Sequence, residues 1–136
     1  MAPSPETVAR RLIEEGFNEG NLDVLDELIS PDMIEHQDHG PDHPAGAEGM
    51  RAVVAGLRGS FSNFHLQIED IAVAGENVWL RSKGRGTNDG EIMGRPPTGR
   101  SMEIDAFDVV RVVDGRIVEH WGLPDRAATL QQLGLM

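Results

Sequence analysis

Carboxylates and histidines are the side chains that could carry proton transfer in this 136-residue chain, because it contains neither cysteine nor tyrosine. The segment RVVDGRIVEHWGLPD, residues 111–125, is typical of a hairpin with a strand on each side. Side chains two apart on a strand share a face, so Asp108 with Val110, and Val118 with His120 and Gly122, are predicted on one mostly apolar wall. A carboxylate and an imidazole there could remove a proton next to a carbonyl group and return it elsewhere.

Structural roles are the alternative for both residues. Asp108 would then make a structural hydrogen bond or pair with Arg111 or Arg116 at the sheet surface. Such structural ion pairs are common and can resemble catalytic sites with perturbed pKa values. His120 would place a half-buried ring against a backbone carbonyl. His36, at the end of a short predicted strand, is a third candidate, as an acid or a donor that orients substrate.

The histidine-rich loop after His36 also invites a metal-site interpretation, since imidazole and carboxylate groups bind metals. It contains His39 and His43 with Asp38 and Asp42. Its glycine and prolines leave no regular ligand spacing, so we expect a solvated loop at the rim of a cavity and no metal. Nucleotide-binding glycine motifs and the GxSxG elbow are absent from the sequence, and no cofactor is expected.

The N-terminal third of the chain has helical periodicity. Ser4 ahead of Pro5 predicts a helix start, and this helix ends near Gly20. Asn21 caps a second, short helix that stops at Pro31. The segment DMIEH predicts a brief strand, and a third amphipathic helix runs from about residue 44 to 61.

After residue 64 the period changes to alternation. Two strands joined near Gly75 are followed by a turn-rich segment, and two more strands flank Asp114-Gly115. Asp125 is predicted to cap a closing helix. Helices followed by an antiparallel meander indicate one α+β domain, residues 1–136, with a curved sheet wrapped around the N-terminal helices.

Charge and hydropathy restrict the partners and the location. Lysine and arginine number 12 against 23 aspartates and glutamates, so a net charge of -11 disfavours nucleic acid and anionic membranes as partners. No run reaches the ~20 apolar residues of a membrane span, and the first residues lack the apolar core of a secretion signal. We therefore expect a cytoplasmic protein.

Three stretches, FNEGNLDVLDELISPDMIEH, EIMGRPPTGRSMEIDAFDVVRVVDGRIVEHW and the terminal PD with its helix, carry a family resemblance. Over nearly its whole length the chain resembles SnoaL-like polyketide cyclases and ester cyclases of the nuclear transport factor 2-like superfamily. The resemblance implies a cone-shaped α+β barrel, usually a homodimer, with a mainly apolar cavity open at one end. It also implies ring closure by intramolecular aldol condensation, without metal or organic cofactor, on a hydrophobic small molecule.

The chain departs from the family at the expected base. The catalytic aspartate of the cyclases lies three residues before the aspartate of the terminal PD, where this chain has Gly122. A histidine of the preceding strand falls on Asp108. A relocated base and a lost activity both stay open, so the hypotheses are a cyclase, isomerase or dehydratase, a non-catalytic ligand-binding domain, and an epoxide hydrolase that activates water.

Two sets of apolar residues complete the predictions. Substrate is expected to contact Met50, Val54, Leu57, Met93, Val110 and Gly122. Trp79, Phe107 and Trp121 belong to the opposite face of the sheet, where they predict a homodimer interface.

Overall fold

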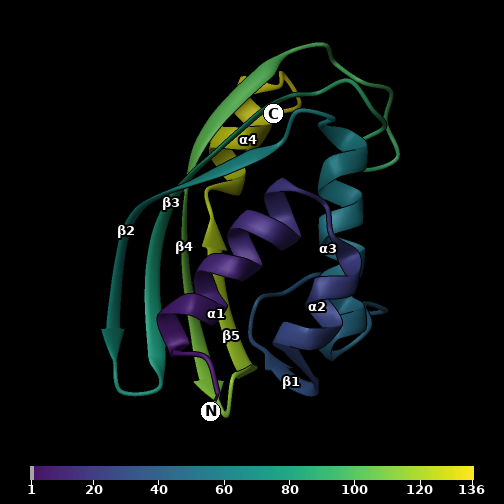
Figure 1. The fold of residues 1–136 in the computed structure, drawn as a ribbon. Coiled ribbons are helices and arrows are strands. Elements are labelled where there is room, and N and C mark those ends of the chain that lie inside the picture. The colour runs from purple at the N-terminus through teal and green to yellow at the C-terminus, as the bar shows by residue number, and fades with distance from the viewer. Residues whose placement is uncertain (1) are drawn as a thin grey trace.

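A computed structural model describes residues 2–136, which form a curved sheet with helices against one face (Figure 1). The helical segments are α1 (Pro5–Arg11), the π-helix η1 (Leu12–Asn18), α2 (Leu22–Leu28), α3 (Gly46–Ser60) and α4 (Arg126–Gln132). The strands are β1 (Ile29–Glu35), β2 (His65–Ala74), β3 (Asn77–Thr87), β4 (Ser101–Val113) and β5 (Arg116–Pro124). The predicted α+β class and the order of the elements are confirmed.

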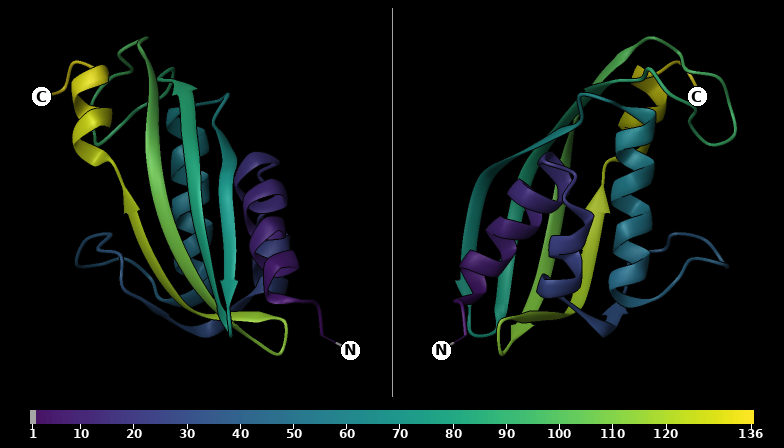
Figure 2. Two further views of the ribbon diagram at one scale, coloured as in Figure 1. Left: turned by 90° about the vertical axis from the view of Figure 1, so that its left-hand side faces the viewer. Right: turned by 45° about the vertical axis from the view of Figure 1, so that its right-hand side comes forward.

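The sheet has the strand order β1-β5-β4-β3-β2. Strands β2 to β5 form an antiparallel meander, whereas the short β1 joins the edge by pairing parallel with β5. Figure 2 shows the long strands bending across α1, α2 and α3, which all lie on the inner side of the curve, while α4 extends from the end of β5. The parallel pair brings the end of the N-terminal helical region beside the C-terminal hairpin.

Capping and close packing fix the N-terminal helices. The Ser4 hydroxyl accepts a hydrogen bond from the amide of Thr7 at 3.2 Å, and Asn21 caps α2 in the same way. Segments α1 and η1 run on without a break, as the single predicted helix requires. A Cβ at Gly16 would lie 2.8 Å from a methyl carbon of Leu25, so the missing side chain lets α2 pack closely.

The core lies between the helices and the inner face of the sheet. Side chains of α1, α2 and α3, among them Val8, Leu25 and Val54, are fully buried there with Val78 and Val110 of the sheet. None of the helices in residues 2–136 is long and apolar enough to cross a membrane.

The β4–β5 hairpin confirms its predicted turn but corrects its predicted faces. Asp114 and Gly115 have φ angles of 51° and 78°, as a tight two-residue hairpin requires. Because the register shifts beyond Arg111, Val112 pairs with Ile117 rather than with Val118. Ile117 is therefore the buried residue, and the expectation that Val118 shares the face of His120 is wrong.

Candidate active site

His120 is held between two carboxylates on the inner face of the sheet. Its Nε2 atom lies 2.8 Å from Oδ1 of Asp108 on β4, and its Nδ1 atom lies 2.7 Å from Oε1 of Glu35 at the end of β1. The ring is 5% exposed. The structure therefore brings Asp108 and His120 together as predicted, and it adds a carboxylate that the sequence did not single out.

Cross-strand register explains this arrangement. Val110 is the partner of His120 and Asp108 is the partner of Gly122, so the ring lies diagonally across from the Asp108 carboxylate on the same face. Glu35 is level with His120 through the parallel pairing of β1 and β5. Arg111, the partner that the structural alternative offered to Asp108, hydrogen-bonds Glu119 instead.

The charges of the site stabilise one another. Burial lowers the pKa of His120, but the hydrogen bonds with Asp108 and Glu35 outweigh it and raise that pKa to about 9. Burial raises the pKa of Glu35, yet the hydrogen bond and positive charge of His120 bring it below its usual range. At neutral pH the ring is thus an imidazolium between two carboxylates.

Asp108 is the most exposed of these three groups, and its Oδ2 atom makes no hydrogen bond to any residue in the range 2–136. Its side chain is 24% exposed, and Oδ1 is the atom that binds His120. Both ring nitrogens of His120 have partners, and Glu35 also accepts a hydrogen bond from the backbone amide of Gln37 at 3.0 Å. The arrangement can accept a proton at Asp108 while the other two groups hold that carboxylate in place.

His36 does not belong to this site. Its ring stacks on Trp121 at a centroid distance of 4.7 Å, and its Nε2 atom lies 2.6 Å from Oε2 of Glu119. Since neighbours on a strand point to opposite faces, Glu35 faces inward with His120 while His36 and Trp121 face outward. His36, the separate candidate acid or orienting donor, therefore lies on the opposite face of the sheet from Asp108 and His120.

The residues predicted to contact substrate divide into three groups. Met50, Val54 and Val110 are buried in the core, and Leu57 is half-buried beside it. Gly122 lies directly beside Asp108 and His120. Met93 is 61% exposed in a turn with a φ of 50°, so its predicted place in the cavity is wrong.

The histidine loop lies at the edge of the site. His39 contacts Glu35 at 3.3 Å and stacks on His43, whose Nε2 lies 3.0 Å from the carbonyl oxygen of Gly49. Within residues 2–136 no group of three or more histidine, aspartate or glutamate side chains is placed to hold a metal ion.

Similarity to known proteins covers nearly the whole chain. The sequence profile of the SnoaL-like polyketide cyclase matches residues 7–133. The chain belongs to the SnoaL-like polyketide cyclase family. It is 32% identical to the aklanonic acid methyl ester cyclase DauD of Streptomyces sp. (strain C5), over 98% of this chain and 83% of that protein. It is 31% identical to the nogalonic acid methyl ester cyclase of Streptomyces nogalater, over 87% of this chain and 89% of that protein.

Solved structures of two Streptomyces proteins have the same fold. Wild-type IdmH of Streptomyces antibioticus superposes with a TM-score of 0.83 at 39% identity, covering 97% of this chain and 99% of IdmH. TsrD of Streptomyces laurentii gives a TM-score of 0.85 at 26% identity, covering 96% of this chain and 95% of TsrD. The expected SnoaL-like architecture is confirmed.

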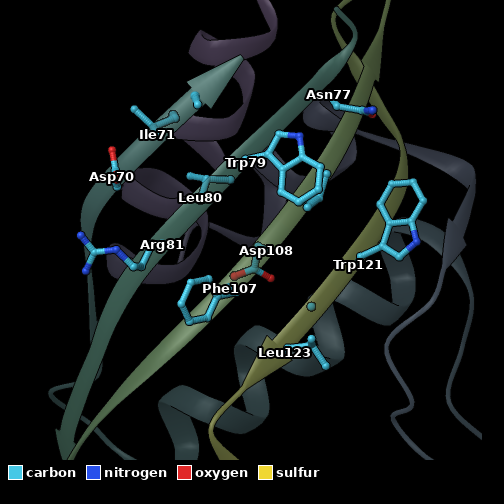
Figure 3. Close-up of a pocket in the computed structure, with 13 residues that line it drawn as sticks. Asp70, Ile71, Asn77, Trp79, Leu80, Arg81, Phe107, Asp108, Trp121 and Leu123 are labelled. Carbon is cyan, nitrogen blue, oxygen red and sulfur yellow. The ribbon is translucent and has the colours of Figure 1, made fainter. Parts of the chain in front are cut away.

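The outer face of this SnoaL-like sheet carries an open apolar groove of about 630 Å³. Figure 3 shows Trp79, Phe107, Trp121 and Leu123 side by side on strands β3, β4 and β5, with the helices behind the sheet. Trp79 and Phe107 are 55% and 53% exposed. As predicted from alternation, these aromatic rings face away from His120.

Proposed function

We propose that the chain is a cofactor-independent acid/base enzyme that closes a ring of a hydrophobic, carbonyl-bearing polyketide by intramolecular aldol condensation, with Asp108 as the base. The observation that carries the proposal is the Asp108–His120–Glu35 cluster, in which the partly exposed Asp108 side chain lies beside a buried imidazolium. Family membership supports the reaction class.

The proposed reaction needs one proton acceptor that later acts as a donor. Asp108 removes a proton from a carbon next to a carbonyl group, which leaves an enolate. The enolate carbon attacks a second carbonyl carbon of the same molecule, and the new carbon–carbon bond forms as the C=O π bond breaks. The resulting alkoxide takes the proton back from Asp108, so the enzyme returns to its starting state.

His120 and Glu35 support this carboxylate without exchanging a proton with substrate. The imidazolium lies 2.8 Å from Oδ1 of Asp108 and holds this carboxylate in position. Glu35 fixes the ring from its other side and keeps it protonated. The pair would therefore compensate for Gly122, which stands where the family cyclases have their aspartate.

The names of the relatives suggest the substrate to try first. By their names, the cyclases at 32% and 31% identity act on the methyl esters of aklanonic acid and nogalonic acid. We infer a substrate of the same class, a polyketide methyl ester with an acidic C–H group.

Substitution of Asp108 by asparagine tests the proposal with aklanonic acid methyl ester as substrate. The change keeps the shape but removes the base, so kcat is expected to fall about 10²- to 10⁴-fold. Asp105→Asn is the matched control, because Asp105 lies on the same strand but pairs with Lys83 at 2.8 Å, away from His120. Full activity of Asp108→Asn, with circular dichroism unchanged, refutes the assignment.

A non-catalytic ligand-binding domain is the second candidate, and Gly122 in place of the family aspartate favours it. Such a protein would bind the methyl ester and release it chemically unchanged. Native mass spectrometry and chromatography of the released ligand distinguish the two, since a cyclised product excludes pure binding. Epoxide opening has less support, because Glu35 and Asp108 bracket the imidazole of His120 where that reaction needs a water.

A further inference from the structure

The proposed aldol reaction needs a hydrogen-bond donor that His120 cannot supply. Removing a proton next to a carbonyl group moves negative charge onto the carbonyl oxygen, and a preorganised donor must stabilise it. Both nitrogens of His120 are occupied, one by Glu35 and one by Asp108. The donor therefore has to come from another residue close to Asp108.

Gln37 is placed to be that donor. The amide of His36 donates to the carbonyl oxygen of His120 at 2.9 Å, and the amide of Gln37 donates to Oε1 of Glu35 at 3.0 Å. These two bonds fix the backbone of Gln37 against the cluster. Its half-buried side chain makes no hydrogen bond to any residue in the range 2–136, so its amide group is uncommitted.

Gly122 shows where that side chain lies. A Cβ built on Gly122 would be 2.9 Å from Oδ1 of Asp108, 2.9 Å from Cε1 of His120, and closer still to Oε1 of Gln37. The end of Gln37 thus occupies the space that a side chain at position 122 would take. Glycine at this position lets an amide, a carboxylate and the edge of the imidazolium converge on one point.

We propose that the side-chain amide of Gln37 donates a hydrogen bond to the substrate carbonyl oxygen and holds the enolate that forms when Asp108 takes the neighbouring proton. This inference rests on the proposed function. A primary amide suits the role because it has two N–H donors and carries no charge that pH could remove. Rotation about the last side-chain bond turns its NH₂ group toward the oxygen, since no protein partner holds it.

Gln37→Leu and Gln37→Glu test the inference, with aklanonic acid methyl ester as the probe. Loss of one oxyanion donor is expected to lower kcat by about 10²- to 10³-fold. The exchange of the acidic C–H proton for deuterium, followed by NMR, should slow in parallel, because enolate formation is the affected step. In Gln37→Leu, which adds no charge, the pH at which activity rises should stay unchanged, since Asp108 and His120 are intact. Gln131→Leu, on the exposed face of α4, is the matched control and should keep wild-type rates.

Gly122→Ala gives an independent variant that retains the amide. Its methyl group should displace the end of Gln37 and slow turnover, and the added effect should shrink in a Gln37→Ala background, where the space is free.

The outcomes separate this inference from the proposed function. If Gln37→Leu keeps a near-normal kcat while Asp108→Asn is inactive in the same assay, the role of Gln37 is overturned and the proposed function stands. A shifted pH profile with unchanged deuterium exchange also overturns it, as this marks a merely structural residue. Absence of both turnover and proton exchange in the wild type overturns the proposed function and this inference together.

Discussion

Oε1 of Glu35 lies 2.7 Å from Nδ1 of His120, although 85 residues separate the two in the chain. The contact exists because β1 pairs parallel with β5, which places Glu35 and His120 as direct partners across the edge of the sheet. The same oxygen accepts a hydrogen bond from the amide of Gln37. One carboxylate therefore fixes the protonated ring on one side and the start of the histidine loop on the other.

Glu35→Gln should lower the pKa of His120 from its value of about 9, because one of the two anions that hold the proton is replaced by a neutral amide. NMR titration of the imidazole ring measures the change directly. We also expect a loss of roughly 1–3 kcal/mol in the free energy of unfolding, as for a buried hydrogen bond to a charged group. Glu119→Gln is the control, since Glu119 binds His36 and Arg111 on the outer face and should leave the pKa of His120 unaffected.

Stability should depend on pH through His120. Its folded-state pKa of about 9 lies above the ordinary value of 6.5, so its contribution is fully present below pH 6.5 and is lost as pH rises through 9. Glu35 acts in the opposite sense: its lowered pKa gives a contribution that is present above the ordinary value of 4.5 and lost as pH falls below that.

The Tm measured between pH 6 and pH 10 should therefore fall with rising pH in the wild type, and a His120→Gln variant should show a flatter profile in that range. On the order of 3 kcal/mol is at stake at His120, the scale that two to three pKa units correspond to. An equally steep decline in His120→Gln would mean that other groups, not this imidazole, control alkaline stability.

The sequence predicts most of the fold because its signals are local. Ser4, Asn21 and Asp125 are cap residues directly before apolar periodic segments. The pair Asp114-Gly115 is typical of a two-residue hairpin turn, in which both residues have positive φ angles. Alternation then places Asp108 and His120 on one face without any knowledge of distant contacts.

The parts of the site that escaped prediction depend on nonlocal geometry. Nothing near Glu35 encodes its parallel pairing with β5, so neither its contact with His120 nor the outward orientation of His36 follows from the sequence. The bulge beyond Arg111 likewise reverses the alternation at Val118. One partial signal was available in the sequence. Adjacent side chains on a strand point to opposite faces, so an assignment of Glu35 to the inner face with His120 would have placed His36 on the outer face.

Asn88→Ala should loosen the segment between β3 and β4. The side chain of Asn88 is completely buried; its amide donates to the carbonyl oxygens of Ser60 and Gly90, and its oxygen accepts from the amide of Thr98 at 2.7 Å. Alanine would remove the partners of the Gly90 carbonyl oxygen and the Thr98 amide, at a cost of about 2–4 kcal/mol, whereas the Ser60 carbonyl oxygen keeps its backbone donors. Limited proteolysis at Arg95 should become faster, whereas Asn63→Ala, which removes a single bond to the amide of Thr87, should have a smaller effect.

The outer face of the sheet should bind a second copy of the chain. We propose a homodimer through the groove of Trp79, Phe107, Trp121 and Leu123, because monomeric proteins rarely expose so continuous an apolar patch. Light scattering at micromolar concentration should give twice the chain mass of 14.8 kDa.

Phe107→Asp would place a charge in the middle of the patch and should shift the mass toward the monomer, since a stable interface leaves few charges unpaired at its centre. Val73→Asp is the control, because Val73 is 47% exposed near the β2–β3 turn and does not line the groove. If the wild type is a monomer, or if both variants remain dimeric, the subunits do not meet through this face.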